Sequence, residues 1–261
     1  MIRTLLDQLL RPGSITVEFQ PIVDIHDGDT TLYAFEALAR GPAGTSLERP
    51  DVLFEYARRK GEESKIDLVV IREVFAAAQS LPFEPCLSIN IHGSTLSDID
   101  GFAEKFLESA NNAGINPRRL MLEIVEHRAP WTMERFRATL QALREAGVRI
   151  AVDDLGVGAS NFRMIVDCRP DHLKVDRYIV GGCSTDRFRA AVLKSIVTLA
   201  NECDAAPIAE GVENAADLAV IEDLGIDLVQ GWYYAHSMPA RDAADWAFLQ
   251  PHTRAMKGFN R

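Results

Sequence analysis

The sequence predicts an α/β protein folded as a TIM-type (β/α)8 barrel, and three observations support this prediction. Eight short strand-like runs occur along the 261 residues, and helical patterns lie between most of them. Such alternation is typical of parallel β/α architectures, and eight strands are the number that closes this barrel. The main alternative is an open doubly wound sheet. No G-x-G-x-x-G follows the first run, which weakens a dinucleotide-binding form of that alternative.

The predicted strands are short runs rich in apolar residues, as expected for strands buried on both faces. The chain has no internal repeat and no linker rich in Gly, Ser or Pro. We therefore expect one compact domain over residues 14–250, with a tail at 251–261. The eight runs are 17–25, 31–39, 86–91, 119–125, 148–154, 172–176, 206–210 and 227–231.

Three segments outside these runs carry clear helix signals. Residues 1–13 predict a short amphipathic helix that ends at Pro12-Gly13. Residues 130–146 and 184–204 repeat apolar side chains at helical spacing, so each is expected to pack one face on the barrel.

Two polar motifs are expected to cap further helices. Ser64 and Asp67 resemble a capping box at the start of a helix over 65–79. Asn214 is expected to cap a helix over 215–224, because a side-chain oxygen at this position accepts from the first free backbone N–H groups.

Composition and charge restrict the function classes. The chain is 47% hydrophobic and 25% charged, the balance of a globular protein rather than of a disordered or membrane-spanning one. Its formal net charge of −10 argues against a general binder of nucleic-acid polymers or anionic membranes. No secretory signal and no run of about 18 apolar residues is present, so we expect a cytoplasmic protein. Its four cysteines form no C-x-x-C pair and are expected to be reduced thiols.

Polar residues stand at or near the carboxyl ends of seven predicted strands, where buried strands should be apolar. In a barrel these ends meet at one mouth, so side chains far apart in sequence can form one pocket. Each of these residues, taken alone, has an alternative interpretation without function. A single Glu would be a solvated side chain, Asp153-Asp154 would belong to a turn, and Lys174 would extend along the surface. Coincidence at every strand end is improbable. The residues are Glu36, Asn90, Glu123, Asp153-Asp154, Lys174, Glu210 and Gln230.

The chemistry of this set favours hard divalent cations. Five carboxylates that share one site resist ionising together unless a cation compensates them. Carboxylate and amide oxygens, without Cys or His, suit Mg²⁺ or Mn²⁺ rather than zinc. Five carboxylates exceed the usual protein ligands of one such ion, so two ions bridged by one Asp are expected, an arrangement used for phosphate-ester hydrolysis. Lys174 then supplies a cation for a phosphate oxygen or for the attacking water.

Eight ordered segments resemble the EAL domain, the bacterial cyclic di-GMP phosphodiesterase module. The signature segment is FEALAR (35–40). The others are FQPIVD (19–24), LSINI (87–91), LEIVE (122–126), VDDLG (152–156), LKVD (173–176), AEGVE (209–213) and QGWYY (230–234). The resemblance implies a modified TIM barrel whose first strand is antiparallel to the rest. It also implies hydrolysis of cyclic di-GMP to linear pGpG.

The resemblance implies roles for individual residues as well. The expected ligands of the two Mg²⁺ or Mn²⁺ ions are Glu36, Asn90, Glu123 and Asp153 for the first, and Asp153, Asp154 and Glu210 for the second. Lys174 is expected to orient the attacking water, and Glu210 is either a ligand or the general base. Arg40 resembles a residue that contacts the substrate phosphate, and Gln20 is expected to face the substrate. Asp176 and Gln230 are expected to support the pocket. Glu126 and Glu213 are expected to support the loop after the paired Asp.

The sequence departs from the family pattern mainly in that loop. Residues 155–161 read LGVGASN, where the family usually has F-G-T-G-Y-S-S. Gly41 stands where an aromatic residue is common, and Ser237 where a Pro is common. A displaced loop would shift the metal-binding Asp pair, so the alternative function is a catalytically weak or inactive cyclic di-GMP receptor. A vestigial interaction domain and a Mg²⁺-dependent enolising barrel are further alternatives.

The resemblance also implies partners. The family commonly forms dimers through the loop after the paired Asp and through nearby helices, so a homodimer is expected. A sensory or regulatory domain or partner outside this chain is expected as well.

Overall fold

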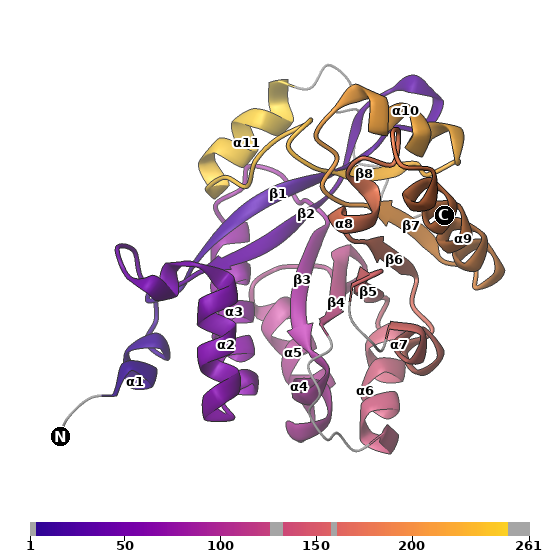
Figure 1. Cartoon of the computed structure of the whole chain (residues 1–261). Coiled ribbons are helices and arrows are strands. Elements are labelled where there is room, and N and C mark those ends of the chain that lie inside the picture. The colour runs from indigo at the N-terminus through magenta and orange to yellow at the C-terminus, as the bar shows by residue number, and fades with distance from the viewer. Residues whose placement is uncertain (1–3, 126–132, 158–160, 250–261) are drawn as a thin grey trace.

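The computed structural model describes residues 4–125, 133–157 and 161–249, and it contains a closed eight-stranded barrel (Figure 1). The strands follow one another around the barrel in chain order. The first strand is antiparallel to both of its neighbours, and the other pairs are parallel. The predicted modified barrel is confirmed. The strands are β1 (Thr16–Asp24), β2 (Thr31–Arg40), β3 (Leu87–His92), β4 (Leu120–Val125), β5 (Arg149–Leu155), β6 (His172–Val175), β7 (Ala206–Ala209) and β8 (Leu228–Gln230).

Helices pack around the outside of this barrel, and the main apolar core lies between the two layers (Figure 1). Each helix contributes buried apolar residues to the protein interior. The helices are α1 (Leu5–Leu9), α2 (Pro50–Lys60), α3 (Glu63–Ala78), α4 (Gly93–Asp98), α5 (Phe102–Asn112), α6 (Met133–Glu145), α7 (Asn161–Cys168), α8 (Arg177–Val180), α9 (Arg187–Glu202), α10 (Ala215–Asp223) and α11 (Ala240–Leu249).

The interior of the barrel is divided into an apolar end and a polar end. Small and medium apolar side chains fill the end where the parallel strands begin, among them Ala34, Met121 and Ile208. The hydroxyl of Tyr33 lies 2.6 Å from Nε2 of His172 in the same region. The interior of the barrel is filled by side chains at this end, so the pocket that the sequence predicts inside the barrel can form only at the opposite mouth.

The β1–β2 hairpin extends beyond the ring of parallel strands. The two strands pair from Thr16 opposite Arg40 to Asp24 opposite Thr31. Pairing of β2 with β3 involves only Phe35 to Ala37 of β2. The end of β2 therefore continues past the barrel rim with β1 as its partner.

One of the two predicted helix caps is wrong. Helix α3 begins at Glu63, and its N-cap residue makes no side-chain cap bond. The Asp67 carboxylate is buried instead, where it accepts from the backbone N–H of His92 and from the Thr95 hydroxyl. Asn214 does cap α10, because its side chain accepts from the N–H of Asp217.

Three cysteines are buried and Cys203 is exposed, and all four are free thiols, consistent with the prediction. Across the described part of the chain, no helix combines the length and apolar character needed to cross a membrane.

Candidate active site

Side chains from all the strands around the barrel converge at the mouth where the parallel strands end. Asn90 on β3 stands directly opposite Glu123 on β4, and Gln20 on β1 stands opposite Glu36 on β2. The Asn90 amide donates to Oε1 of Glu36 at 2.7 Å, and the Gln230 amide on β8 donates to Oε2 at 2.7 Å. Residues separated by almost the whole chain thus hold one carboxylate in place.

Lys174 is the centre of this cluster. Its side chain is 1% exposed, and its Nζ lies among four carboxylates that come from different strands or strand ends. The distances are 2.6 Å to Glu123, 2.6 Å to Glu210, 3.4 Å to Glu36 and 3.5 Å to Asp153. The surface alternative for Lys174 is wrong, because a buried ammonium needs such compensation.

The carboxylates keep Lys174 charged. Burial alone would lower its pKa, but Asp153, Glu123, Glu210 and Glu36 outweigh burial and raise the pKa well above its usual value. The same contact acts on Glu36. Burial would raise the pKa of Glu36, but the ammonium of Lys174 and the amide donors hold it below its ordinary value.

Two other carboxyls resist ionisation. Burial, followed by repulsion from Glu36, raises the pKa of Glu123 well above its ordinary value, although Lys174 opposes the shift. Burial also raises the pKa of Glu210, helped by the neighbouring carboxylates and opposed by Lys174. The single positive charge of Lys174 is therefore too small to keep all these carboxyls ionised. Additional cations would reduce the repulsion among them.

The paired aspartates reach the same site through an irregular backbone. Adjacent residues of a regular strand point to opposite faces. Here Asp154 has a left-handed φ of 56°, and the β5–β6 register shifts between Val152 and Leu155. One oxygen from each of Asp153, Asp154 and Glu210 can consequently lie within 4.8 Å of the others.

Asp154 is exposed at the rim, but its carboxyl faces this cluster. Lost hydration there, together with repulsion from Asp153 and Asp176, raises the pKa of Asp154 to about 6. Gly156 follows with a φ of 108°, and a Cβ at this position would come within 2.6 Å of Ile179. The first loop glycine is therefore required by the backbone path, as the sequence suggests, whereas Gly158 lies outside the described residues.

The donor set fits two hard divalent cations. Four carboxylates (Glu36, Glu123, Asp153 and Glu210) surround the ammonium of Lys174, and that of Asp154 lies close to those of Asp153 and Glu210. When all five are ionised, the cluster carries four excess negative charges. Two divalent cations supply the same number of positive charges. Asn90 adds an amide oxygen, and such oxygen donors are those that Mg²⁺ and Mn²⁺ prefer.

A cavity opens from this cluster toward the surface. Its walls include Glu36 and Glu210 from the cluster, and also Gln20, Asp176, Glu213 and Gln230, all of which the sequence analysis selected. Gln20 donates to the carbonyl oxygen of Ala235 at 3.1 Å. Asp176 caps α8 by accepting from the N–H of Tyr178. Glu213 is exposed, so its supporting role stays a prediction, and Glu126 lies outside the described residues.

Sequence reasoning missed three residues of this site. Ser88 is buried on β3 and donates its hydroxyl proton to Oε1 of Glu123. Arg177 and Trp232 line the cavity. Trp232 is 57% exposed there, and its ring lies at an angle of 35° to that of His236. Of these three residues, only Trp232 had a signal in the sequence. It lies in the QGWYY segment, two residues after the predicted site residue Gln230, and is therefore expected at the same mouth.

Arg40 lies beside the cavity on the extended end of β2. It pairs with Glu18 at 2.9 Å and donates from Nη2 to the hydroxyl of Ser237 at 2.8 Å. The predicted phosphate-contacting arginine is thus held by two neighbours that the sequence analysis did not assign to the site.

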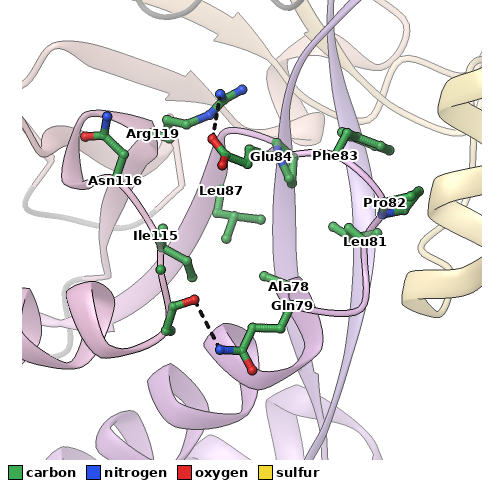
Figure 2. A pocket seen from close by; sticks show the side chains of 13 residues that line it. Ala78, Gln79, Leu81, Pro82, Phe83, Glu84, Leu87, Ile115, Asn116 and Arg119 are labelled. Atoms are coloured by element: carbon green, nitrogen blue, oxygen red, sulfur yellow. Dashed lines mark hydrogen bonds and ion pairs between the residues drawn. The ribbon is translucent and has the colours of Figure 1, made fainter.

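A second cavity lies at the opposite end of the barrel (Figure 2). It is lined by residues from the end of α3, the segment between α3 and β3, the start of β3 and the segment after α5, including Leu81, Phe83 and Ile115. Arg119 and Glu84 pair at 3.5 Å at its edge. None of the clustered carboxylates lines this cavity, so it is separate from the candidate active site.

Comparisons with known proteins agree with this geometry. The EAL domain matches residues 3–237. The probable cyclic di-GMP phosphodiesterase PdeB of Escherichia coli is 28% identical over 246 residues, which cover 93% of this chain and 46% of PdeB. The cyclic di-GMP phosphodiesterase NbdA of Pseudomonas aeruginosa is 27% identical, with 90% of this chain and 30% of NbdA covered. The chain thus spans less than half the length of these curated relatives.

Solved structures show the same similarity. Klebsiella pneumoniae BlrP1, in a complex with calcium and cyclic di-GMP, matches with a TM-score of 0.75 and 27% identity, covering 90% of this chain and 62% of that one. A standalone EAL protein of Vibrio cholerae, in its cyclic di-GMP-bound form, matches with a TM-score of 0.74 and 25% identity, covering 87% and 93%. The family match, the antiparallel first strand and the carboxylate cluster agree, and the chain belongs to the EAL domain family of cyclic di-GMP phosphodiesterases.

Proposed function

We propose that this chain is a metal-dependent phosphodiesterase that hydrolyses cyclic di-GMP to linear pGpG. The observation that carries the proposal is the cluster of five carboxylates, four of which lie within 3.5 Å of the buried ammonium of Lys174. A receptor that only binds the nucleotide does not need so many costly buried charges at one point. The proposed catalytic unit is residues 14–250.

Each residue type contributes a distinct part of the chemistry. The carboxylates, with Asn90, would hold two Mg²⁺ or Mn²⁺ ions, which when bound supply Lewis-acid activation of a water and neutralise phosphate charge. Lys174 donates hydrogen bonds toward oxygens that gain charge at phosphorus, from a site that excludes bulk water. Glu210 lies 2.6 Å from Lys174 and can accept a proton from the attacking water. Arg40 and Gln20 would orient the substrate.

A direct assay tests this proposal. Purified protein is incubated with cyclic di-GMP and Mg²⁺ or Mn²⁺, and pGpG is measured by chromatography. We expect turnover that a chelator abolishes, and a loss of at least about a hundredfold in Glu36→Gln and Glu210→Gln. Glu55→Gln, on the exposed surface of α2, is the control and should retain activity.

The same experiment separates hydrolysis from binding alone. Calorimetry with cyclic di-GMP in the presence of Ca²⁺ or Mn²⁺ measures affinity without relying on turnover. Binding with no pGpG formed across a series of metals would contradict the proposal and favour a receptor. Neither binding nor turnover would favour a vestigial interaction domain.

We also propose that the chain forms a homodimer through α7 and Val157. Phe162 and Val166 are each 72% exposed and lie four residues apart, on one face of the helix, and Val157 is 47% exposed just before it. A second copy of this chain is the proposed occupant. Phe162→Asp should convert a dimer to a monomer in light scattering, and a monomeric wild type would overturn the proposal.

A further inference from the structure

Arg40 is held on three of its nitrogen atoms by groups of the protein itself. Its Nε donates to Oε2 of Glu18 at 3.0 Å, and its Nη2 lies 2.9 Å from the same oxygen. Nη2 also donates to the Ser237 hydroxyl at 2.8 Å, and Nη1 donates to the carbonyl oxygen of Ala39 at 3.1 Å. Ser237 in turn donates to Oε2 of Glu18 at 2.7 Å. One carboxylate oxygen thus receives three donors.

The backbone fixes the members of this group relative to one another. Glu18 and Arg40 lie on the same face of the β1–β2 hairpin, since Glu18 pairs with Leu38 and Arg40 is two residues further on. Ser237 is brought to them by its neighbour Met238, whose backbone N–H and C=O both bond to Phe19. The contact is therefore built into the hairpin and does not depend on one adaptable side chain.

The group opposes the binding of a phosphate. A guanidinium binds phosphate best through two parallel N–H groups, and Glu18 occupies the Nε–Nη2 edge of Arg40. Its negative charge also cancels the positive charge that would attract a phosphate. Both side chains are partly exposed, at 23% for Arg40 and 31% for Glu18, so the pair can open without leaving a buried charge.

We propose that Glu18, braced by Ser237, is an internal competitor for the guanidinium of Arg40 and thereby sets the affinity of the active site for the substrate phosphate. This inference rests on the proposed function. Arg40 is the substrate-contacting residue, and Glu18 and Ser237 act through it as positioning residues. Ser237 stands where a Pro is common in the family and supplies the hydroxyl that holds the competitor in place.

The inference predicts a change in KM rather than in kcat, because Glu18 acts on a residue proposed to bind the substrate and is not one of the four carboxylates around Lys174. Glu18→Gln keeps the size of the side chain and an oxygen that accepts from Arg40, but removes the charge. We expect KM for cyclic di-GMP to fall about two- to fivefold at low ionic strength, the range for a partly exposed ion pair. High salt should reduce the difference. Ser237→Ala should lower KM in the same direction and by less.

The test measures kcat, KM and the Kd for cyclic di-GMP with Ca²⁺ in wild type, Glu18→Gln, Ser237→Ala and the control Glu55→Gln, which alters an exposed pair on α2. A KM and Kd of Glu18→Gln equal to or above those of wild type would overturn the inference while leaving the proposed function intact. A wild type that neither binds nor cleaves cyclic di-GMP would overturn the proposed function, and this inference with it.

Discussion

Replacing Lys174 with Met is the most informative perturbation of the candidate site. Methionine keeps much of the length of the side chain but removes its charge. In the wild type, Nζ of Lys174 lies 2.6 Å from both Glu123 and Glu210. The Glu123 side chain is 0% exposed, so without the ammonium its carboxylate has no solvent to compensate it. The variant must either protonate this group or lose stability.

The expected magnitude follows from the burial of the contact. Removing one partner of a buried ion pair typically costs about 3–5 kcal/mol of unfolding free energy. For a domain of this size, each kcal/mol lowers the melting temperature by about 2–4 °C, so we expect Lys174→Met to melt roughly 10 °C below wild type in a chelator. The pKa values of Glu123 and Glu210, already raised, rise further in the variant. Its folded state then binds more protons than its unfolded state, so the deficit shrinks as pH falls toward the ordinary pKa of Glu, 4.5.

Divalent cations give the same experiment a second readout. The ammonium competes with metal ions for the same carboxylates, so Mn²⁺ should stabilise Lys174→Met more than it stabilises wild type. Melting curves are recorded with chelator and with Mn²⁺, at mildly alkaline and mildly acidic pH. Lys105→Met is the matched control, since Lys105 is exposed and donates to a backbone carbonyl on the surface. Equal melting of Lys174→Met and wild type in chelator, or no extra gain from Mn²⁺, would refute the reasoning.

Three further predictions concern separate parts of the fold. Trp232→Ala should raise KM for cyclic di-GMP about tenfold or more, because an exposed aromatic at the mouth can stack on a guanine. Burial lowers the pKa of His172 to about 3, so the contribution of His172 to stability should fall by about 2 kcal/mol from pH 6.5 to 5, and the denaturant midpoint of wild type should fall over that range relative to that of His172→Gln. Asp217→Asn should cost about 2 kcal/mol in urea unfolding, since the carboxylate accepts from two backbone N–H groups and from Ser184.

Each of these predictions has an outcome that contradicts it. An unchanged KM in Trp232→Ala would remove the stacking role. Parallel pH profiles of wild type and His172→Gln would mean that His172 does not titrate differently on unfolding. If Asp217→Asn were as stable as wild type, an amide would stabilise the turn at Gly182 as well as a carboxylate does.

The barrel could be predicted because its signals are local. The first predicted strand, 17–25, is observed as Thr16–Asp24, and the third, 86–91, as Leu87–His92. Short apolar runs that alternate with helical patterns indicate buried strands of a parallel sheet. The convergence of the carboxylates could be predicted for a related reason, because parallel strands in a barrel place their carboxyl ends at one mouth.

Contacts that depend on tertiary packing could not be predicted in this way. Asp67 has the spacing of a capping box with Ser64, but His92 and Thr95 offer its carboxylate stronger partners across the fold. Nothing near Asp67 in the sequence identifies these partners. Glu18 was missed for the same reason, because its partner Arg40 lies across a hairpin and Ser237 lies after the last strand.

The position of the paired aspartates depends both on the local sequence and on the irregular backbone of β5. Regular strand geometry would turn one of Asp153 and Asp154 away from the mouth. The left-handed backbone at Asp154 brings both carboxyls to the cluster, at a conformational cost of about 1–2 kcal/mol for a residue with a Cβ. That cost is imposed where three carboxyls, those of Asp154, Glu123 and Glu210, already resist ionisation. Both features are costly to stability at the same place, and bound cations of the kind proposed above would offset the repulsion among these carboxyls.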